Sequence, residues 1–243
     1  INIQFALKND RVYVIEVNPR ASRTVPFISK VIDVPLAKIA AQLAVGKKFN
    51  EINLKTNSKK GLIAVKKPVF PFNKFPQQSV FLSPEMKSTG EVIGFDTHLG
   101  SAYAKAESGA GQSLPEQGTI FMSVNDSDKM DAIPIARDFK ELGFKIMATD
   151  GTALLLSENG VETDSIFKVG EGRPNVVDAI KNKEVHLVIN TPLGAQSRFD
   201  EYEIGRAAIR YKVPAITTIS GAQAAVRGIR NTFANKIKYR SLQ

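Results

Sequence analysis

From residue 118 onward, short apolar runs alternate with amphipathic segments, and this pattern restricts the possible folds more than any other feature of the chain. The apolar runs include GTIFMSV, FKIMAT and VHLVIN, and an amphipathic helix is expected around residues 132–142. Apolar runs of about five residues separated by amphipathic helices predict a parallel sheet that helices cover on both faces. We therefore expect a doubly wound, Rossmann-like α/β domain over residues 116–243, with ligands bound at the carboxyl ends of its strands.

Residues 1–115 predict an α+β arrangement instead. Its expected strands and helices, in chain order, are strands at residues 1–7 and 11–17, a helix between Pro35 and Gly46, a strand at 62–65 and a short helix at 101–107. The pair Asn9-Asp10 favours a tight turn between the first two strands. The stretch SGAGQSLPEQG is small, polar and rich in turn-forming residues, so we place the domain boundary there, after residue 115.

Composition excludes several classes of protein. The chain has no cysteine, which rules out disulfides and thiolate metal sites, and no apolar run approaches the roughly 18 residues needed to cross a bilayer. We expect a cytoplasmic protein without a membrane partner. Because the sequence opens without methionine on a strand-like pattern, we expect residue 1 to be a cut within a longer chain.

The net charge of +9 raises nucleic acid as a partner. The excess of cations lies in residues 1–115 at scattered positions, and no RNP-like or helix-turn-helix pattern accompanies it. Anionic small substrates explain such a distribution equally well. We therefore expect no nucleic-acid partner. A basic nucleic-acid binder remains the competing hypothesis.

The first candidate site combines a carboxylate with amide oxygens. Glu16 and Asn18 are two apart on an expected strand and so share a face, opposite Tyr13, Ile15 and Val17. These hard-oxygen ligands suit magnesium or manganese. An ordinary polar strand edge beside a solvated arginine run is the alternative that the bare spacing leaves open.

Three further side chains extend this first site. Gln4 joins it from the preceding strand if a three-residue connection places it opposite Glu16, whereas a two-residue turn would pair it with Ile15. Arg20 and Arg23 follow directly and supply charge to neutralise nucleotide phosphates.

The second candidate site is an anion pocket at the strand ends of residues 118–243. Small hydroxyls, an amide and two lysines follow the apolar runs; they are Lys129, Thr149, Thr152, Lys168, Asn190 and Thr191. Thr149 and Thr152 flank a glycine at a strand-to-helix turn, where backbone N–H groups and the helix dipole favour an anion. The alternative is a turn with a helix cap beside solvated lysines.

The segment VIEVNPRASRTVPFISK closely resembles the metal-binding end of an ATP-grasp domain, specifically that of the carbamoyl phosphate synthetase large chain. PFNKFP and PEMKSTGEVIGFD resemble the same family in the same order. The resemblance implies the end of the second, carbamate-phosphorylating ATP-grasp unit. The activity implied is ATP-dependent and glutamine-hydrolysing, with Mg²⁺ or Mn²⁺ as cofactors, K⁺ as a further candidate, and a glutamine amidotransferase small chain as partner.

The same resemblance gives roles to the first site. Positions that match Gln4, Glu16 and Asn18 hold the divalent metals, and positions that match Arg20 and Arg23 lie near the transferred phosphate. The ATP-enclosing loops would precede Ile1, so the fragment alone is expected to be inactive.

Residues 116–243 resemble a methylglyoxal synthase-like allosteric domain. The resemblance implies that Lys129, Thr149, Thr152, Lys168 and Asn190 hold the phosphate and ribose of a nucleoside monophosphate such as UMP. Where methylglyoxal synthase has a catalytic aspartate, this chain has Arg173 in GEGRP, so a regulatory role is expected instead of lyase chemistry.

Three departures from the family pattern concern the effectors. Lys67 replaces a glutamate and Ala215 a tyrosine that contact ornithine in activated relatives, although Thr217 remains, and Pro192 replaces a nucleotide-binding hydroxyl. We therefore expect that ornithine does not activate this protein. An oligomer is compatible with the sequence, and a stand-alone regulatory module without catalytic activity is the alternative function.

Overall fold

The computed structural model describes residues 1–54, 61–72, 74, 86–191, 198–234 and 239. Contacts divide the chain into two compact units, Ile1–Leu62 with Tyr239, and Ile63–Lys238. The domain boundary expected after residue 115 falls inside the second of these contact-based units. It stays a prediction about where one family domain ends and the next begins. Within the described ranges, no helix has the length and apolar character to cross a membrane.

The first unit begins with an antiparallel hairpin and continues with helices. Its elements are β1 (Asn2–Lys8), β2 (Arg11–Asn18), α1 (Thr24–Ile32), α2 (Leu36–Ala44) and the short η1 (Phe49–Glu51). The turn of the hairpin contains only Asn9 and Asp10, both with positive φ, at 50° and 58°. Asn and Asp tolerate this left-handed conformation better than other residues with a side chain, which explains why the chain reverses here.

A β-bulge changes the register halfway along this hairpin. Pairing from Lys8 opposite Arg11 runs regularly to Phe5 opposite Val14, and then Gln4 pairs with Glu16. Ile15 is the extra residue on β2. The expected three-residue connection is therefore wrong, yet Gln4 still lies opposite Glu16, because the bulge compensates for the shorter turn.

The bulge also corrects the expected faces of β2. Paired residues share a face, so Ala6 and its partner Tyr13 lie on the face of Gln4 and Glu16, and not opposite them as expected. Val17 lies on the other face, as predicted. Strict alternation fails at this point because the inserted residue shifts the phase of the strand by one.

The second unit contains the parallel sheet that the sequence predicts. Its strands lie in the order β7-β6-β5-β8-β9 and every pairing is parallel. These strands are β5 (Thr119–Val124), β6 (Lys145–Thr149), β7 (Asp164–Ile166), β8 (Leu187–Thr191) and β9 (Ala215–Ile216). The helices are α4 (Lys129–Glu141), α5 (Asp150–Glu158), α6 (Val176–Lys181), α7 (Arg198–Tyr211) and α8 (Ile219–Ala234).

Two apolar clusters show that helices cover both faces of this sheet. Ile120 and Met122 of β5 pack with residues of α4, α5 and α8. Phe121, between them, points to the other face and packs with residues of α6 and α7. Successive residues of the strand thus enter opposite layers, which confirms the doubly wound arrangement.

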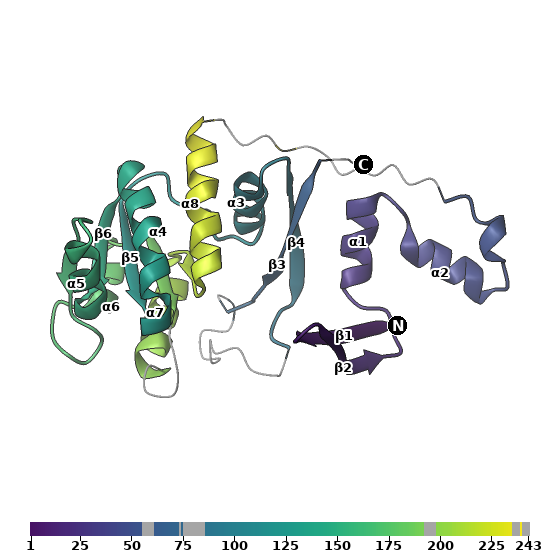
Figure 1. Cartoon of the computed structure of the whole chain (residues 1–243), viewed down its shortest axis with the longest axis horizontal. Coiled ribbons are helices and arrows are strands. Elements are labelled where there is room, and N and C mark those ends of the chain that lie inside the picture. The colour runs from purple at the N-terminus through teal and green to yellow at the C-terminus, as the bar shows by residue number, and fades with distance from the viewer. Residues whose placement is uncertain (55–60, 73, 75–85, 192–197, 235–238, 240–243) are drawn as a thin grey trace. The chain divides into compact units, whose positions relative to one another are not determined.

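A second, antiparallel strand pair belongs to the same unit. It consists of β3 (Ile63–Val69) and β4 (Gly90–Asp96), and α3 (Leu99–Gly109) follows it. Helix α3 lies beside α8 (Figure 1). The two backbones come closest to each other's side-chain space at Gly100 of α3 and Arg227 of α8. A Cβ atom on Gly100 would lie 2.6 Å from the carbonyl carbon of Arg227. Only glycine permits this helix crossing.

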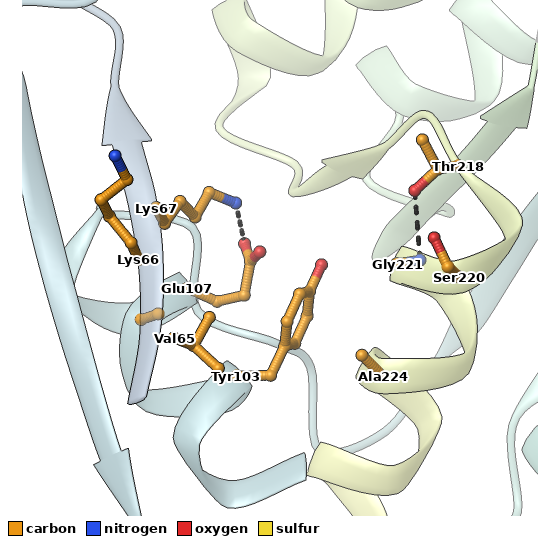
Figure 2. Close-up of a pocket in the computed structure, with 10 residues that line it drawn as sticks. Val65, Lys66, Lys67, Tyr103, Glu107, Thr218, Ser220, Gly221 and Ala224 are labelled. Carbon is orange, nitrogen blue, oxygen red and sulfur yellow. Dashed lines mark hydrogen bonds and ion pairs between the residues drawn. The ribbon is translucent and has the colours of Figure 1, made fainter. Parts of the chain in front are cut away.

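A buried ion pair ties β3 to α3. The ammonium of Lys67 donates to the carboxylate of Glu107, which is 2% exposed (Figure 2). It also donates to Oε1 of Gln112 at 3.1 Å. Tyr103 lies one turn before Glu107 on α3, and its pKa is raised above the usual value by burial and by the charge of Glu107. Lys67 is therefore the counter-charge that allows Glu107 to be buried.

We predict that Gly100→Ala lowers the free energy of unfolding by about 1–3 kcal/mol, because the added methyl group pushes α3 away from the α8 backbone. Gly109→Ala, on the same helix, is the control: its Cβ would lie 3.4 Å from the Val92 side chain, an ordinary contact. Chemical denaturation measures both. Equal losses for the two variants would contradict the close crossing at Gly100.

We predict that Lys67→Met destabilises the chain by about 2–3 kcal/mol, because it leaves the Glu107 carboxylate buried without a counter-charge. Lys66→Met is the matched control on the same strand. The Lys66–Glu91 pair spans 3.4 Å and is more exposed, so its loss should cost less than about 1 kcal/mol. Thermal unfolding of both variants checks this, and a smaller loss for Lys67→Met would count against the pair.

Candidate functional site

The hairpin of the first unit carries the predicted metal-binding residues. Gln4 and Glu16 pair across the two strands, and Asn18 follows on the same face two residues later. Gln4 and Glu16 are exposed and Asn18 is half-buried. One carboxylate with two amide oxygens is a hard-oxygen set with a single negative charge. Such a set fits Mg²⁺ or Mn²⁺ when phosphate oxygens complete the coordination.

The two arginines lie in the short connection between β2 and α1, beside the end of β2 that carries Asn18. Arg20 is exposed and donates to the carbonyl of Ala21 at 3.2 Å, and half-buried Arg23 directly precedes α1. Nδ2 of Asn2 donates to Oγ of Ser22 at 3.0 Å, which ties this connection to the hairpin. Both guanidinium groups thus follow the oxygen ligands at one end of the strand pair.

The carboxyl edge of the parallel sheet carries all six predicted anion-site residues. Thr149 ends β6, and Thr152 lies in the first turn of α5. Asn190 and Thr191 end β8, Lys129 begins α4 after β5, and Lys168 follows β7. Parallel strands end at one edge of the sheet. Lys129 and Thr191, which are 62 positions apart in the sequence, are therefore brought to the same side of the sheet.

Hydrogen bonds hold the neutral members of this edge in place. Oγ1 of Thr152 accepts from the backbone N–H of Val124 at 3.3 Å, and Oγ1 of Thr191 accepts from that of Asn125 at 3.2 Å. Thr149, Thr152 and Thr191 are 2–3% exposed and Asn190 is 9% exposed. These hydroxyls are thus positioned before any ligand arrives.

Lys129 lies beside the amino end of α5, which also carries positive charge. A methyl group added to Gly151, in the first turn of α5, would lie 3.7 Å from Nζ of Lys129. The amino end of a helix carries partial positive charge from its unpaired N–H groups. The lysine and the helix therefore converge on one point, which favours an anion there.

Both lysines of this edge are paired with nearby carboxylates. Nζ of Lys129 lies 2.6 Å from Oδ1 of Asp126, and Nζ of Lys168 lies 3.8 Å from Oε1 of Glu171. The hydrogen bond from Lys129 lowers the pKa of Asp126, and the charge of Lys168 adds to this effect. Burial raises the pKa of Asp200, which Glu171 also raises and Lys168 opposes.

Sequence reasoning missed the residues that organise this edge. Asn125 caps the short η2 helix (Asp126–Asp128) by accepting from the N–H of Asp128, and its Nδ2 donates to the carbonyl of Thr191 at 3.0 Å. It therefore joins the ends of β5 and β8. An asparagine directly after an apolar run, followed by acidic residues, is a recognisable capping signal that could have identified it.

A cavity of about 360 Å³ lies elsewhere in the second unit, between β3 and α3 on one side and the start of α8 on the other (Figure 2). Lys67, Tyr103 and Glu107 line it, and none of the six anion-site residues does. The ammonium of Lys67 points directly to the Glu107 carboxylate on the β3 and α3 side of this cavity. Of the other residues that depart from the family pattern, Ala215 belongs to β9, and Pro192 lies outside the described residues.

Two family models match separate parts of the chain. Residues 1–52, which contain the hairpin, match the carbamoyl-phosphate synthase L chain, ATP binding domain. Residues 131–217, which contain most of the parallel sheet, match the MGS-like domain. The first match contains every residue of the candidate metal site, and the second contains the candidate anion-site residues except Lys129, which lies two residues before it.

Curated relatives match across the chain. It is 54% identical to a carbamoyl phosphate synthase large chain from Archaeoglobus fulgidus over its whole length, which is 23% of that relative. It is 47% identical to a C-terminal section of such a large chain from Aquifex aeolicus and 51% identical to one from Methanopyrus kandleri. These alignments cover 95% and 94% of this chain and 46% and 44% of the relatives.

The chain therefore spans less than half the length of these relatives. With both family matches in the order of its two sites, it belongs to the carbamoyl phosphate synthase large-chain family and carries that family's ATP-binding and MGS-like regions.

Proposed function

We propose that this chain takes part in the ATP-dependent, glutamine-hydrolysing synthesis of carbamoyl phosphate, as the carboxyl-terminal part of a large chain with its regulatory domain. The observation that supports the catalytic part best is the pairing of Gln4 with Glu16, which the bulge at Ile15 creates. A tight turn alone would have separated these two oxygen donors. The partner proposed for ammonia supply is a glutamine amidotransferase small chain.

In this proposal, the hairpin holds the metal that accompanies ATP. Glu16 supplies the charged oxygen, and Gln4 and Asn18 supply neutral oxygens on the same face. A bound Mg²⁺ or Mn²⁺ would screen the charge on phosphate oxygens. Arg20 and Arg23 act next to it by attracting the phosphate and holding it in position, the main requirement in phosphoryl transfer. We propose K⁺ as a further cation and no catalysis by the 243-residue chain alone.

We expect Glu16→Gln, placed in the intact large chain with its partner, to lower carbamoyl phosphate synthesis by about 100-fold or more, because the hairpin loses its only charged oxygen ligand. Asp10→Asn is the control, since Asp10 is an exposed carboxylate at the turn of the same hairpin. Initial rates at several Mg²⁺ concentrations give the result. Wild-type activity of Glu16→Gln would remove Glu16 from the metal site.

We also propose that the carboxyl edge of the parallel sheet binds a nucleoside monophosphate such as UMP and regulates the enzyme. The amino end of α5 and the hydroxyls of Thr149 and Thr152 would donate hydrogen bonds to the phosphate. Lys129 and Lys168 would neutralise it. Arg173 offers no carboxylate base, so the site binds its ligand without lyase chemistry.

The contacts around Lys67 bear on whether ornithine activates this protein. The Lys67 ammonium pairs with the Glu107 carboxylate at the wall of the 360 Å³ cavity, and Lys67 replaces a glutamate that contacts ornithine in activated relatives. We therefore propose that ornithine does not activate this protein. The stand-alone regulatory module is the less favoured alternative, because the match to the ATP binding domain covers residues 1–52.

We expect Thr152→Val to weaken UMP binding by about tenfold or more, because a hydroxyl that donates to a charged phosphate is lost at nearly constant volume. Thr152→Ser keeps the hydroxyl and should bind within a few-fold of wild type. Isothermal titration of the chain with UMP and IMP measures both. If wild type releases no binding heat, or if Thr152→Val binds normally, the proposed nucleotide site is wrong.

A further inference from the structure

Each lysine of the proposed nucleotide site already has an anion of its own. Asp126 pairs with Lys129 and Glu171 with Lys168, in both cases across three residues. The two pairs differ in strength. The first is a close contact of 2.6 Å, whereas the second spans 3.8 Å between half-exposed side chains. Asp126 is therefore the carboxylate that competes more strongly for its lysine.

The turn that carries Asp126 is held in place by its neighbours. Oδ1 of Asn125 accepts from the Asp128 N–H at 3.1 Å and from the Ser127 hydroxyl, while Nδ2 of Asn125 donates to Thr191. These bonds fix η2 against the end of β8. The backbone that carries Asp126 is thus fixed by the fold three residues before Lys129.

The charges around Lys129 explain why a carboxylate is favoured there. Its ammonium lies beside the amino end of α5, so two positive charges approach each other. Asp126 compensates them, and the lowered pKa of Asp126 reflects its hydrogen bond from Lys129 with a contribution from Lys168. The Asp126 carboxylate therefore interacts electrostatically with both lysines of the site.

We infer that Asp126 is an internal competitor of the phosphate: it neutralises Lys129 in the empty site and must yield that lysine when a phosphate dianion binds. The inference rests on the proposed nucleotide site. The Asp126 side chain is 93% exposed, so it is released directly into water and the exchange is easy. A dianion gains more from Lys129 and the α5 terminus than the single carboxylate does. Asp126 therefore weakens binding and selects dianionic phosphates over singly charged ligands.

The experiment measures UMP and inorganic phosphate binding by isothermal titration to the whole chain. We expect Asp126→Asn to bind both about two- to fivefold more tightly, the range that follows from the strength of exposed ion pairs. Asp126→Ser is a second variant that removes the same charge and favours the same turn. Circular dichroism confirms that each variant is folded.

Two control variants separate competition for Lys129 from a general effect of charge. Asp131→Asn removes an exposed carboxylate two residues after Lys129 on α4. Glu162→Gln breaks an exposed pair of the same 2.6 Å length with Lys140, about 16 Å further along α4. Both should leave the affinities unchanged.

The outcomes distinguish this inference from the function on which it rests. Binding that is unchanged or weaker in both Asp126 variants, with wild type binding UMP, overturns the inference and leaves the nucleotide site intact. An equal gain in Asp131→Asn also overturns it, because the cause would then be the overall field. If neither wild type nor any variant binds, the nucleotide site fails and the inference fails with it.

Discussion

The parallel pairing of β5 with β6 on one side and β8 on the other is the constraint on which the second unit depends. Ile120, Phe121 and Met122 of β5 are fully buried, and they alternate between the two apolar layers. A strand buried on both faces cannot slip by one residue without exchanging the two layers. That fixed register holds the ends of β5, β6 and β8 together, and it determines where the residues of the proposed anion site lie.

The hairpin of the first unit shows how one inserted residue can decide a site. Its turn of Asn9 and Asp10 sets a register in which Gln4 would face Ile15, and the bulge replaces Ile15 by Glu16. The local hydrogen bonding of the ladder is disturbed at this one point. In exchange, the carboxylate and the amide come to lie on one face, together with Asn18 and Tyr13.

Burial separates two kinds of ion pair in the second unit. Glu107 is almost completely buried, so its pair with Lys67 is required for the packing of α3 and has no easy alternative in water. Asp126 is almost fully exposed, so its pair with Lys129 exchanges readily with solvent or with another anion. The same chemistry thus gives a structural contact in one place and a replaceable one in the other.

The sequence by itself determined the doubly wound fold, the approximate limits of the strands and the position of the six proposed anion-site residues at or shortly after the carboxyl ends of strands. It could do so because these features depend on local apolar periodicity and on the rule that parallel strands share a carboxyl edge. Only the tertiary structure decided the bulge at Ile15, the pairing of Lys67 with Glu107 and that of Lys129 with Asp126. A bulge leaves no periodic trace, and ion pairs depend on which side chains meet after packing, which residue spacing does not encode.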